Sequence, residues 1–120
     1  MRHLKKGRKL GREKDQRKAL MKTMMGSLVM YEKITTTEAK AKELKTRVDR
    51  VINKAKKAKD ASSKVTAIRN LDNNIPKMAI KKLLGDFKKK FEDRNSGYTR
   101  IIKLAPRKTD GARMAVIEFV

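Results

Sequence analysis

The chain has 120 residues, the size of one domain, and its 34 lysines and arginines against 13 aspartates and glutamates give a net charge of +21. Small domains ordinarily carry a net charge of about 2–8, so a fold this basic is typical of a protein that meets a polyanion. The lack of cysteine excludes disulfides and thiolate zinc sites, and the single histidine, His3, excludes a three-histidine metal centre. We expect no metal or other cofactor.

Residues 1–15 differ in composition from the rest, being rich in cations and poor in large apolar side chains. Gly7 and Gly11 each disfavour a helix by about 1 kcal/mol. We therefore expect a basic extended N-terminal arm over residues 1–15 and a single α/β domain over residues 16–120. A solvated tail is the alternative interpretation of the arm, but its arginines offer planar forks suited to phosphate. The predicted phosphate contacts in and after the arm are Arg2, Lys5, Lys6, Arg8, Lys9, Arg12, Arg17 and Lys18.

The first predicted helix covers residues 16–31, with Asp15 as its expected N-cap. Its apolar residues recur at the spacing of one helical face and are Leu20, Met21, Met24, Met25, Leu28 and Val29. Gly26 weakens this helix or lets another part of the backbone come close. A short β-prone run, residues 33–36, follows it.

A second helix is expected after Thr36 or Thr37, one of which would cap it. Its buried face is predicted to hold Ala41, Leu44, Val48, Val51, Ile52, Ala55 and Ala58. A third, short helix would turn Val65, Ile68 and Leu71 inward. A fourth would begin near Pro76 and bury Ile80, Leu83, Leu84, Phe87 and Phe91, with Gly85 as a weak point within it.

From Asn95 the apolar period changes from 3.6 to 2, which indicates strands. Residues 98–104 and 113–119 alternate, and the Gly-containing loop 106–111 between them predicts a hairpin. The fold class is therefore α+β, in the order α-β-α-α-α-β-β. We expect the helices to pack on one face of a small three-stranded mixed sheet.

The motifs of known enzymes are lacking, since the sequence has neither a phosphate-binding loop of the Walker type nor a nucleophile elbow. We therefore expect no catalysis and no small-molecule substrate. Beyond the arm, two more regions are candidates for phosphate contact. One combines three hydroxyls with a helix N-terminus and comprises Thr35, Thr36, Thr37, Lys40 and Lys42. The other comprises Tyr98, Thr99 and Arg100, together with Arg107 and Lys108 in the hairpin loop.

A basic arm, basic loops and a basic helix end suit an irregular folded RNA better than a uniform duplex. Few aromatic residues are present, which disfavours a single-strand binder that stacks bases. Two alternatives remain open: an architectural DNA-binding protein, and a polycation that binds a membrane surface. The uncharged stretches are too short to span a bilayer, and no apolar run follows the basic N-terminus as a secretory signal would require. We expect a cytoplasmic protein without membrane contact.

Several short motifs resemble one known family in order and spacing. They are Met1-Arg2-His3, Gly7-Arg8-Lys9-Leu10, Arg17-Lys18-Ala19-Leu20, Ile34-Thr35-Thr36-Thr37, Ala39-Lys40-Ala41-Lys42-Glu43-Leu44, Gly97-Tyr98-Thr99-Arg100-Ile101 and Ala115-Val116-Ile117-Glu118. In these the chain resembles the bacterial large-subunit ribosomal protein L-seventeen family. The resemblance implies a structural, ribosome-bound role on large-subunit (23S) rRNA near the polypeptide exit region, and it adds His3 to the RNA contacts. It also implies neighbouring ribosomal proteins as partners, including the small zinc-ribbon protein thirty-two.

Overall fold

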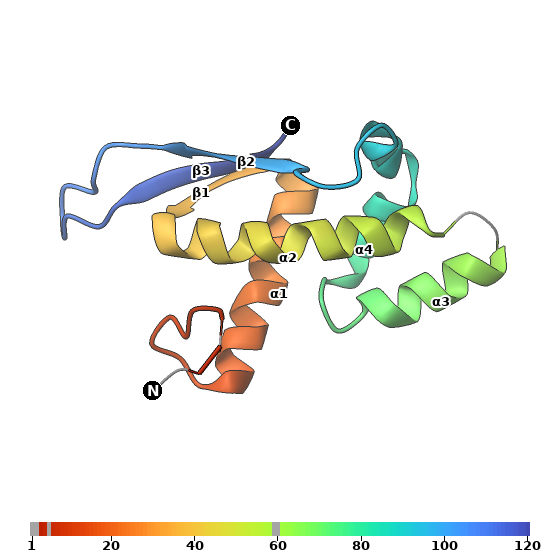
Figure 1. The fold of residues 1–120 in the computed structure, drawn as a ribbon, viewed down its shortest axis with the longest axis horizontal. Helices are drawn as coiled ribbons and strands as arrows, with labels where there is room; N and C mark the ends of the chain where they lie inside the picture. Colours follow the sequence, from red (N-terminus) through yellow and green to blue (C-terminus); the bar gives the residue numbers. More distant parts are fainter. Residues whose placement is uncertain (1–2, 5, 59–60) are drawn as a thin grey trace.

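The structure is a computed structural model that describes residues 3–4, 6–58 and 61–120. Its elements follow the predicted order and are drawn in Figure 1. They are α1 (Lys14–Tyr31), β1 (Lys33–Thr37), α2 (Glu38–Lys56), α3 (Ala61–Leu71), α4 (Lys77–Leu84), the 3₁₀ helix η1 (Asp86–Phe91), β2 (Thr99–Lys103) and β3 (Met114–Phe119). The α+β class predicted from the sequence is therefore confirmed.

The three strands form a sheet in the order β1-β3-β2. Lys33 of β1 lies opposite Glu118 of β3, and Thr99 of β2 lies opposite Phe119, so both pairs are antiparallel. The expectation of a mixed sheet was wrong in this respect. β1 and β2 run in the same direction on either side of β3, which makes every neighbouring pair antiparallel.

The helices cover one face of the sheet, as predicted, and α2 runs alongside all three strands (Figure 1). The core between them includes Leu28, Leu44, Val48, Ile52 and Ile117, all fully buried. Burying a side chain of this size contributes about 1.5–3 kcal/mol. The core therefore fixes α1 and α2 relative to the sheet, and with them the cations on their outer faces.

Four aromatic rings close the end of the core beyond α4. Phe87, Phe91, Tyr98 and Phe119 lie with neighbouring centroids 5.1–5.3 Å apart, mostly edge to face. This arrangement adds about 0.5–1.5 kcal/mol per pair beyond burial. The cluster joins η1 to the start of β2 and the end of β3, so it anchors the base of the hairpin.

Helix α1 begins two residues earlier than predicted, with Glu13 rather than Asp15 at the N-cap. Asp15 lies in the first turn, where a carboxylate faces the positive end of the helix dipole. Another segment does come close at Gly26, but the neighbour is the ring of a proline and not the backbone that we expected. A methyl group at Gly26 would lie 2.6 Å from Cγ of Pro76, so glycine lets the start of α4 pack against α1.

The remaining helices differ from expectation in two places. In α3 the inward face holds Ala67 and Leu71, whereas Val65 and Ile68 are about half exposed, so turning those two residues inward was wrong. The face with small Ala67 allows α3 to lie close to its neighbours. The predicted fourth helix is divided at Gly85 into α4 and η1, at the weak point that the sequence indicated.

Candidate nucleic-acid interface

The described residues of the N-terminal arm, 3–4 and 6–15, fold back against the domain, in contrast to the extended arm that we expected. Leu10 and Gly11 adopt positive φ angles of 55° and 64°, and the backbone N–H of Arg12 donates to the carbonyl of Lys9 over 3.1 Å. Leu10 packs partly buried against the hydrophobic core. This one apolar contact and the tight turn beside it give the described part of the arm a defined path.

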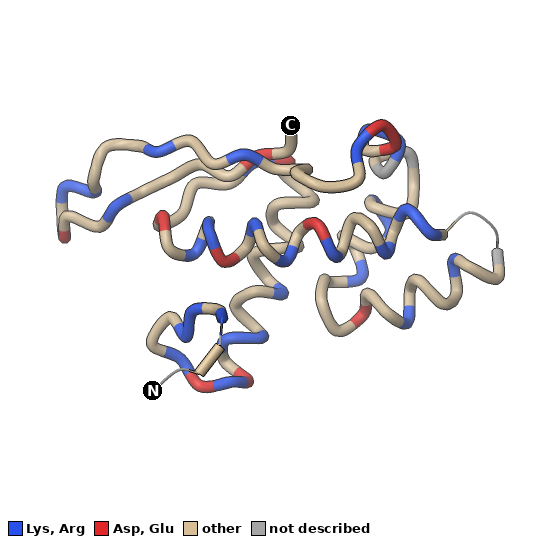
Figure 2. The backbone as a smooth tube through the Cα atoms, in the orientation of Figure 1, with Lys and Arg blue, Asp and Glu red and all other residues tan. Residues whose placement is uncertain are grey.

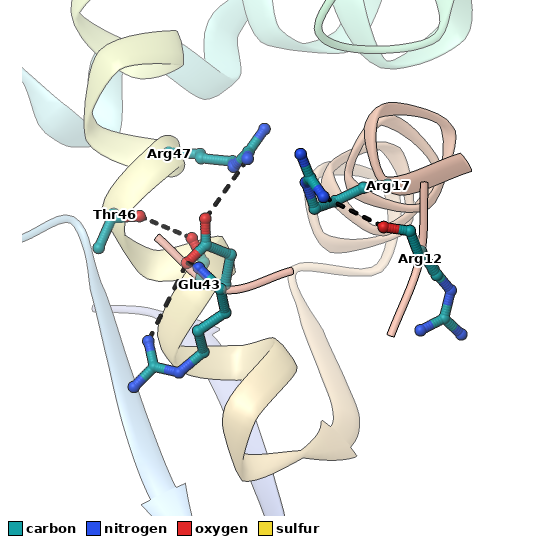
Figure 3. Close-up of polar contacts among 6 residues, drawn as sticks. Arg12, Arg17, Glu43, Thr46 and Arg47 are labelled. Atoms are coloured by element: carbon teal, nitrogen blue, oxygen red, sulfur yellow. Dashed lines mark hydrogen bonds and ion pairs between the residues drawn. The ribbon is translucent and has the colours of Figure 1, made fainter. Parts of the chain in front are cut away.

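Glu43 of α2 connects the arm to the helix, as Figure 3 shows. Its Oε2 accepts the backbone N–H of Arg8 at 3.2 Å and lies 4.0 Å from the Arg8 guanidinium. Its Oε1 accepts a hydrogen bond from the Arg47 guanidinium at 3.3 Å. Because the Glu43 side chain is only 7% exposed, this carboxylate is a partly desolvated anchor for two arginines from different segments.

A groove lies between the arm, α1 and α2, with a volume of about 940 Å³. Its floor is apolar and includes Met21, Met25 and Val51. Among its described lining residues, one carboxylate, Glu43, faces seven cations. These cations are Lys6, Arg8, Lys18, Lys22, Arg47, Arg50 and Lys54. A concave surface with this excess of positive charge focuses its own positive electrostatic potential, and this potential attracts a polyanion.

The predicted contacts of the arm divide between this groove and other surfaces. Lys6, Arg8 and Lys18 line the groove. Arg12 and Arg17 instead donate to backbone carbonyls. Arg12 donates to Leu10 at 2.7 Å, and Arg17 donates to Arg12 at 3.1 Å, as Figure 3 shows for the latter. These two arginines shape the turn into α1. His3 and Lys9 are exposed on the arm, while Arg2 and Lys5 lie outside the described residues.

Four groove cations were missed by sequence reasoning: Lys22, Arg47, Arg50 and Lys54. Three of them lie on α2 at steps of three and four residues, which places them on one face of the helix next to Glu43. That spacing was a usable signal. What the sequence does not indicate is that Glu43, on the same face, is buried.

The threonine region lies on β1 and at the start of α2. Thr37 is the N-cap of α2, as predicted, but without a side-chain capping bond. The first turn of α2 holds the carboxylate of Glu38. This carboxylate bonds Lys42 at 2.8 Å and lies 3.7 Å from Lys103. The hydrogen bond from Lys42 is the main reason that the pKa of Glu38 lies below its usual value. Lys42 is thus partly neutralised, whereas Thr35 remains exposed on the sheet edge.

Tyr98 and Thr99 are buried, so their side chains do not reach the surface. The Tyr98 hydroxyl bonds Asn53 of α2 at 2.5 Å, and its backbone N–H donates to Asp49 at 3.3 Å. Thr99 Oγ1 is buried without a hydrogen-bond partner in the described part of the chain. Arg100 alone of this motif is exposed, and its Nε bonds Glu118 across the sheet at 2.8 Å. Tyr98 therefore fixes the start of β2, and Arg100 presents the charge.

The hairpin between β2 and β3 extends away from the helices, with basic residues near its tip (Figure 2). Arg107 forms two bonds to Asp110, Nε to Oδ1 at 2.9 Å and Nη2 to Oδ2 at 2.7 Å. This pairing, with the backbone N–H of Ala112, lowers the pKa of Asp110 to about 2. The tip is therefore rigid but partly neutralised, with Lys108 exposed beside it.

The predicted contacts thus do not form one continuous site. Groove, threonine edge and hairpin are spread over a molecule whose principal extents are 48 × 31 × 25 Å, and Figure 2 shows cations along all of them. In the described ranges, no three acidic or histidine side chains gather as metal ligands would. Nor is any helix among those ranges long and apolar enough to cross a membrane.

The fold and the groove define a class: a small basic α+β protein whose helices and sheet present cations on several surfaces. Comparison with known proteins identifies the family, because a family model described as ribosomal protein L17 matches residues 20–120. The chain belongs to the ribosomal protein L17 family. It is accordingly a ribosomal protein and not an enzyme.

Curated relatives carry the same name, large ribosomal subunit protein bL17. The protein of Chlorobium limicola is 49% identical over all of this chain and 77% of its own length. That of Rubrobacter xylanophilus is 45% identical over all of this chain and 96% of its own. That of Staphylococcus carnosus is 43% identical over 94% of this chain and 98% of its own.

Proposed function

We propose that this protein is a structural, non-catalytic constituent of the bacterial large ribosomal subunit that binds and stabilises folded 23S rRNA. The observation that carries the proposal is the groove between the arm, α1 and α2, where seven cations face one carboxylate among the described lining residues. Membership of a ribosomal protein family supports ribosomal RNA as the polyanion. The protein would act in the cytoplasm, bound to the ribosome.

The groove serves as the main backbone contact, and the other basic surfaces add to it. In the groove, Lys6, Arg8 and Lys18 act together with the four cations from α1 and α2 that sequence reasoning missed. The arm contributes Arg2, His3, Lys5, Lys9 and the turn stabilised by Arg12 and Arg17. The sheet edge contributes Thr35, Thr36, Thr37, Lys40 and Lys42. The hairpin contributes Arg100, Arg107 and Lys108, with Tyr98 and Thr99 holding Arg100 in place.

The location within the subunit follows from the family resemblance: near the polypeptide exit region, beside other ribosomal proteins that include protein thirty-two. The membrane alternative loses its support, because the apolar faces of α1 and α2 are buried in the core and cannot insert into lipid. The architectural DNA-binding alternative predicts equal affinity for duplex DNA and for rRNA. Measuring the affinities for duplex DNA and for rRNA at the same salt concentration distinguishes the DNA-binding alternative from the proposed function.

The test of the groove is the salt dependence of binding to a 23S rRNA transcript. The variant replaces Arg50 and Lys54, both exposed, with alanine. Each phosphate contact contributes about 0.7–0.9 to the slope of log affinity against log salt, so this slope should become shallower by roughly 1.5. The matched control replaces the exposed Lys64 and Arg69 of α3, outside the groove, and should keep the parent slope.

The same variants should then compete with the parent chain during reconstitution of the large subunit. We expect the groove variant to be under-represented in particles isolated on a sucrose gradient. Equal slopes and equal incorporation for the groove variant and the α3 control would contradict the proposed role of the groove. A parent chain that never sediments with the large subunit would contradict the proposed function as a whole.

A further inference from the structure

A second concave surface lies where α1 ends against α4 and η1, and nothing above assigns it a role. We call it the methionine hollow. It has a volume of about 750 Å³, its apolar wall comprises Met30, Met78 and Phe87, and its rim comprises Lys81, Lys82 and Lys90. Met78 is 72% exposed and Met30 is 38% exposed, so large apolar side chains face solvent here. These flexible apolar side chains, gathered around one hollow, are available to pack against a partner.

Part of the rim is held in place by a carboxylate and a ring. Lys90 bonds Glu32 at 3.1 Å, and Lys82 lies 4.0 Å from the same carboxylate while donating to the carbonyl of Met30 at 2.9 Å. Both ammonium groups also lie over the Phe87 ring, 5.0 and 5.2 Å from its centroid. The hydrogen bond from Lys90 is the main reason that the pKa of Glu32 is lowered. Because these groups are already ordered, a ligand need not order them on binding.

The chemistry of the hollow differs from that of the basic groove. Two of its three rim lysines share Glu32, so the hollow has a smaller excess of cations than the groove. Phe87 is only 7% exposed, with lysines over the ring, and it offers no open face on which a base could stack. The exposed methionines instead need an apolar partner, and their flexible thioethers adapt to one. An RNA strand therefore fits this surface poorly.

We propose that the methionine hollow docks a segment of a neighbouring ribosomal protein that places an apolar side chain between Met30 and Met78 and an acidic side chain beside Lys81. The acidic residue follows from charge complementarity, since among the described side chains three rim lysines face one carboxylate, that of Glu32. A second copy of this chain is a poor occupant, because two molecules of charge +21 repel each other. The inference rests on the proposed function, which supplies the ribosomal neighbours.

The site is also separate from the RNA groove along α1. Lys18 and Met25 of that helix line the groove, whereas Met30 lines the hollow. The nearest of these, Met25 and Met30, are five residues apart, which is about 7.5 Å along the helix axis and about 140° around it, and no described residue lines both surfaces. One helix can therefore present its beginning to RNA and its end to protein. Such a bridge between two kinds of partner suits a structural component of a ribonucleoprotein.

The experiment places the photoreactive residue benzoylphenylalanine at position 78, in place of Met78, and assembles this chain into large subunits. After irradiation, nuclease digestion and mass spectrometry identify what is attached. We expect a polypeptide with an aspartate or glutamate within about three residues of the attachment point. The control places the same residue at Val65 of α3, which is 50% exposed but lies outside the hollow. It should not give that peptide.

A charge reversal tests the acidic partner. The substitution Lys81→Glu, in the chain carrying the photoreactive residue, should reduce the yield of the attached peptide roughly tenfold, because it places two carboxylates together. The matched control Lys64→Glu should leave the yield unchanged. An unchanged yield with Lys81→Glu would overturn the proposal, as would attachment to rRNA alone, to a peptide without acid residues, or to nothing. If any of these results is found while the parent chain still sediments with the large subunit, the docking proposal fails and the proposed function stands. If the parent chain does not sediment with the large subunit, both the docking proposal and the proposed function fail.

Discussion

The contact between Gly26 and Pro76 predicts that Gly26→Ala destabilises the fold when Pro76 is present and stabilises it when Pro76 is replaced by alanine. Gly26 lies within α1 and is buried against the ring of Pro76, the N-cap of α4. In Gly26→Ala, the new methyl group would lie 2.6 Å from Cγ and 2.7 Å from Cδ of that ring. Ordinary carbon contacts are about 3.5–4.0 Å, so the start of α4 must move by about 1 Å.

The expected magnitude combines two opposing effects. Alanine is better than glycine in a helix interior by about 0.8–1 kcal/mol. Overpacking a core contact costs about 1–3 kcal/mol, and a rigid ring that cannot change rotamer favours the upper part of that range. We expect Gly26→Ala to lower the free energy of unfolding by about 1–2 kcal/mol. For a chain of this size, each kcal/mol lowers the melting temperature by roughly 3–6 °C.

The control is the same substitution in a Pro76→Ala background. Removing Cγ and Cδ leaves the Pro76 Cβ position, which is 3.7 Å from the new methyl group and therefore in ordinary contact. In this background Gly26→Ala should raise the free energy of unfolding by up to about 1 kcal/mol, from helix propensity alone. Urea unfolding followed by circular dichroism measures all four variants. The same sign of effect in both backgrounds would refute the steric explanation.

Two further predictions concern the basic surfaces. Glu43→Ala removes the acceptor for the Arg8 N–H, a charged hydrogen bond worth about 1.5–3 kcal/mol, so hydrogen exchange of the Arg8 amide should accelerate by roughly 10- to 150-fold. Glu43→Gln, which keeps one acceptor, should give a smaller increase, and equal exchange in all three chains would show that Glu43 does not hold the arm. The Asp110 carboxyl should titrate near pH 2 by carbon NMR, because Arg107 stabilises its charged form. That stabilisation is present above the unfolded pKa of about 3.8 and is lost as the pH falls toward 2. In Arg107→Gln the midpoint should return toward 3.8, and an identical midpoint in both chains would contradict the pairing.

The sequence predicted the elements of this fold well, because each long helix carries a clear apolar stripe and the hairpin a clear alternation. It failed where the outcome depended on contacts between distant segments. The arm folds back through one carboxylate 35 residues away, which no local pattern indicates. In α3, two sets of apolar residues competed for the core, and the set with the smaller Ala67 was buried.

For the candidate site, too, local patterns were predicted well and contacts between distant segments were not. The abundance of cations in residues 1–18 and the i, i+4 pairing of Glu38 with Lys42 are visible in the sequence, but the pairing of Arg8 with Glu43 is not. Tyr98 was a natural candidate for contact with RNA because it sits beside Arg100. It is buried because Gly97, at a φ angle of 66°, turns the chain just before β2 and lets Asn53 and Asp49 bind the tyrosine.

The acidic residues of this chain explain how a protein of charge +21 can fold and still present the basic groove that we propose as a polyanion site. Glu38, Asp110 and Glu118 each fix a cation at the sheet edge, the hairpin tip or the sheet face, and each lowers the charge available there. In the groove, by contrast, Glu43 is the one carboxylate among the described lining residues against seven cations. The pairing orients Arg8 and Arg47 without neutralising the surface, because five further cations surround it. Affinity for RNA should therefore be concentrated in the groove, with the paired surfaces contributing chiefly to orientation.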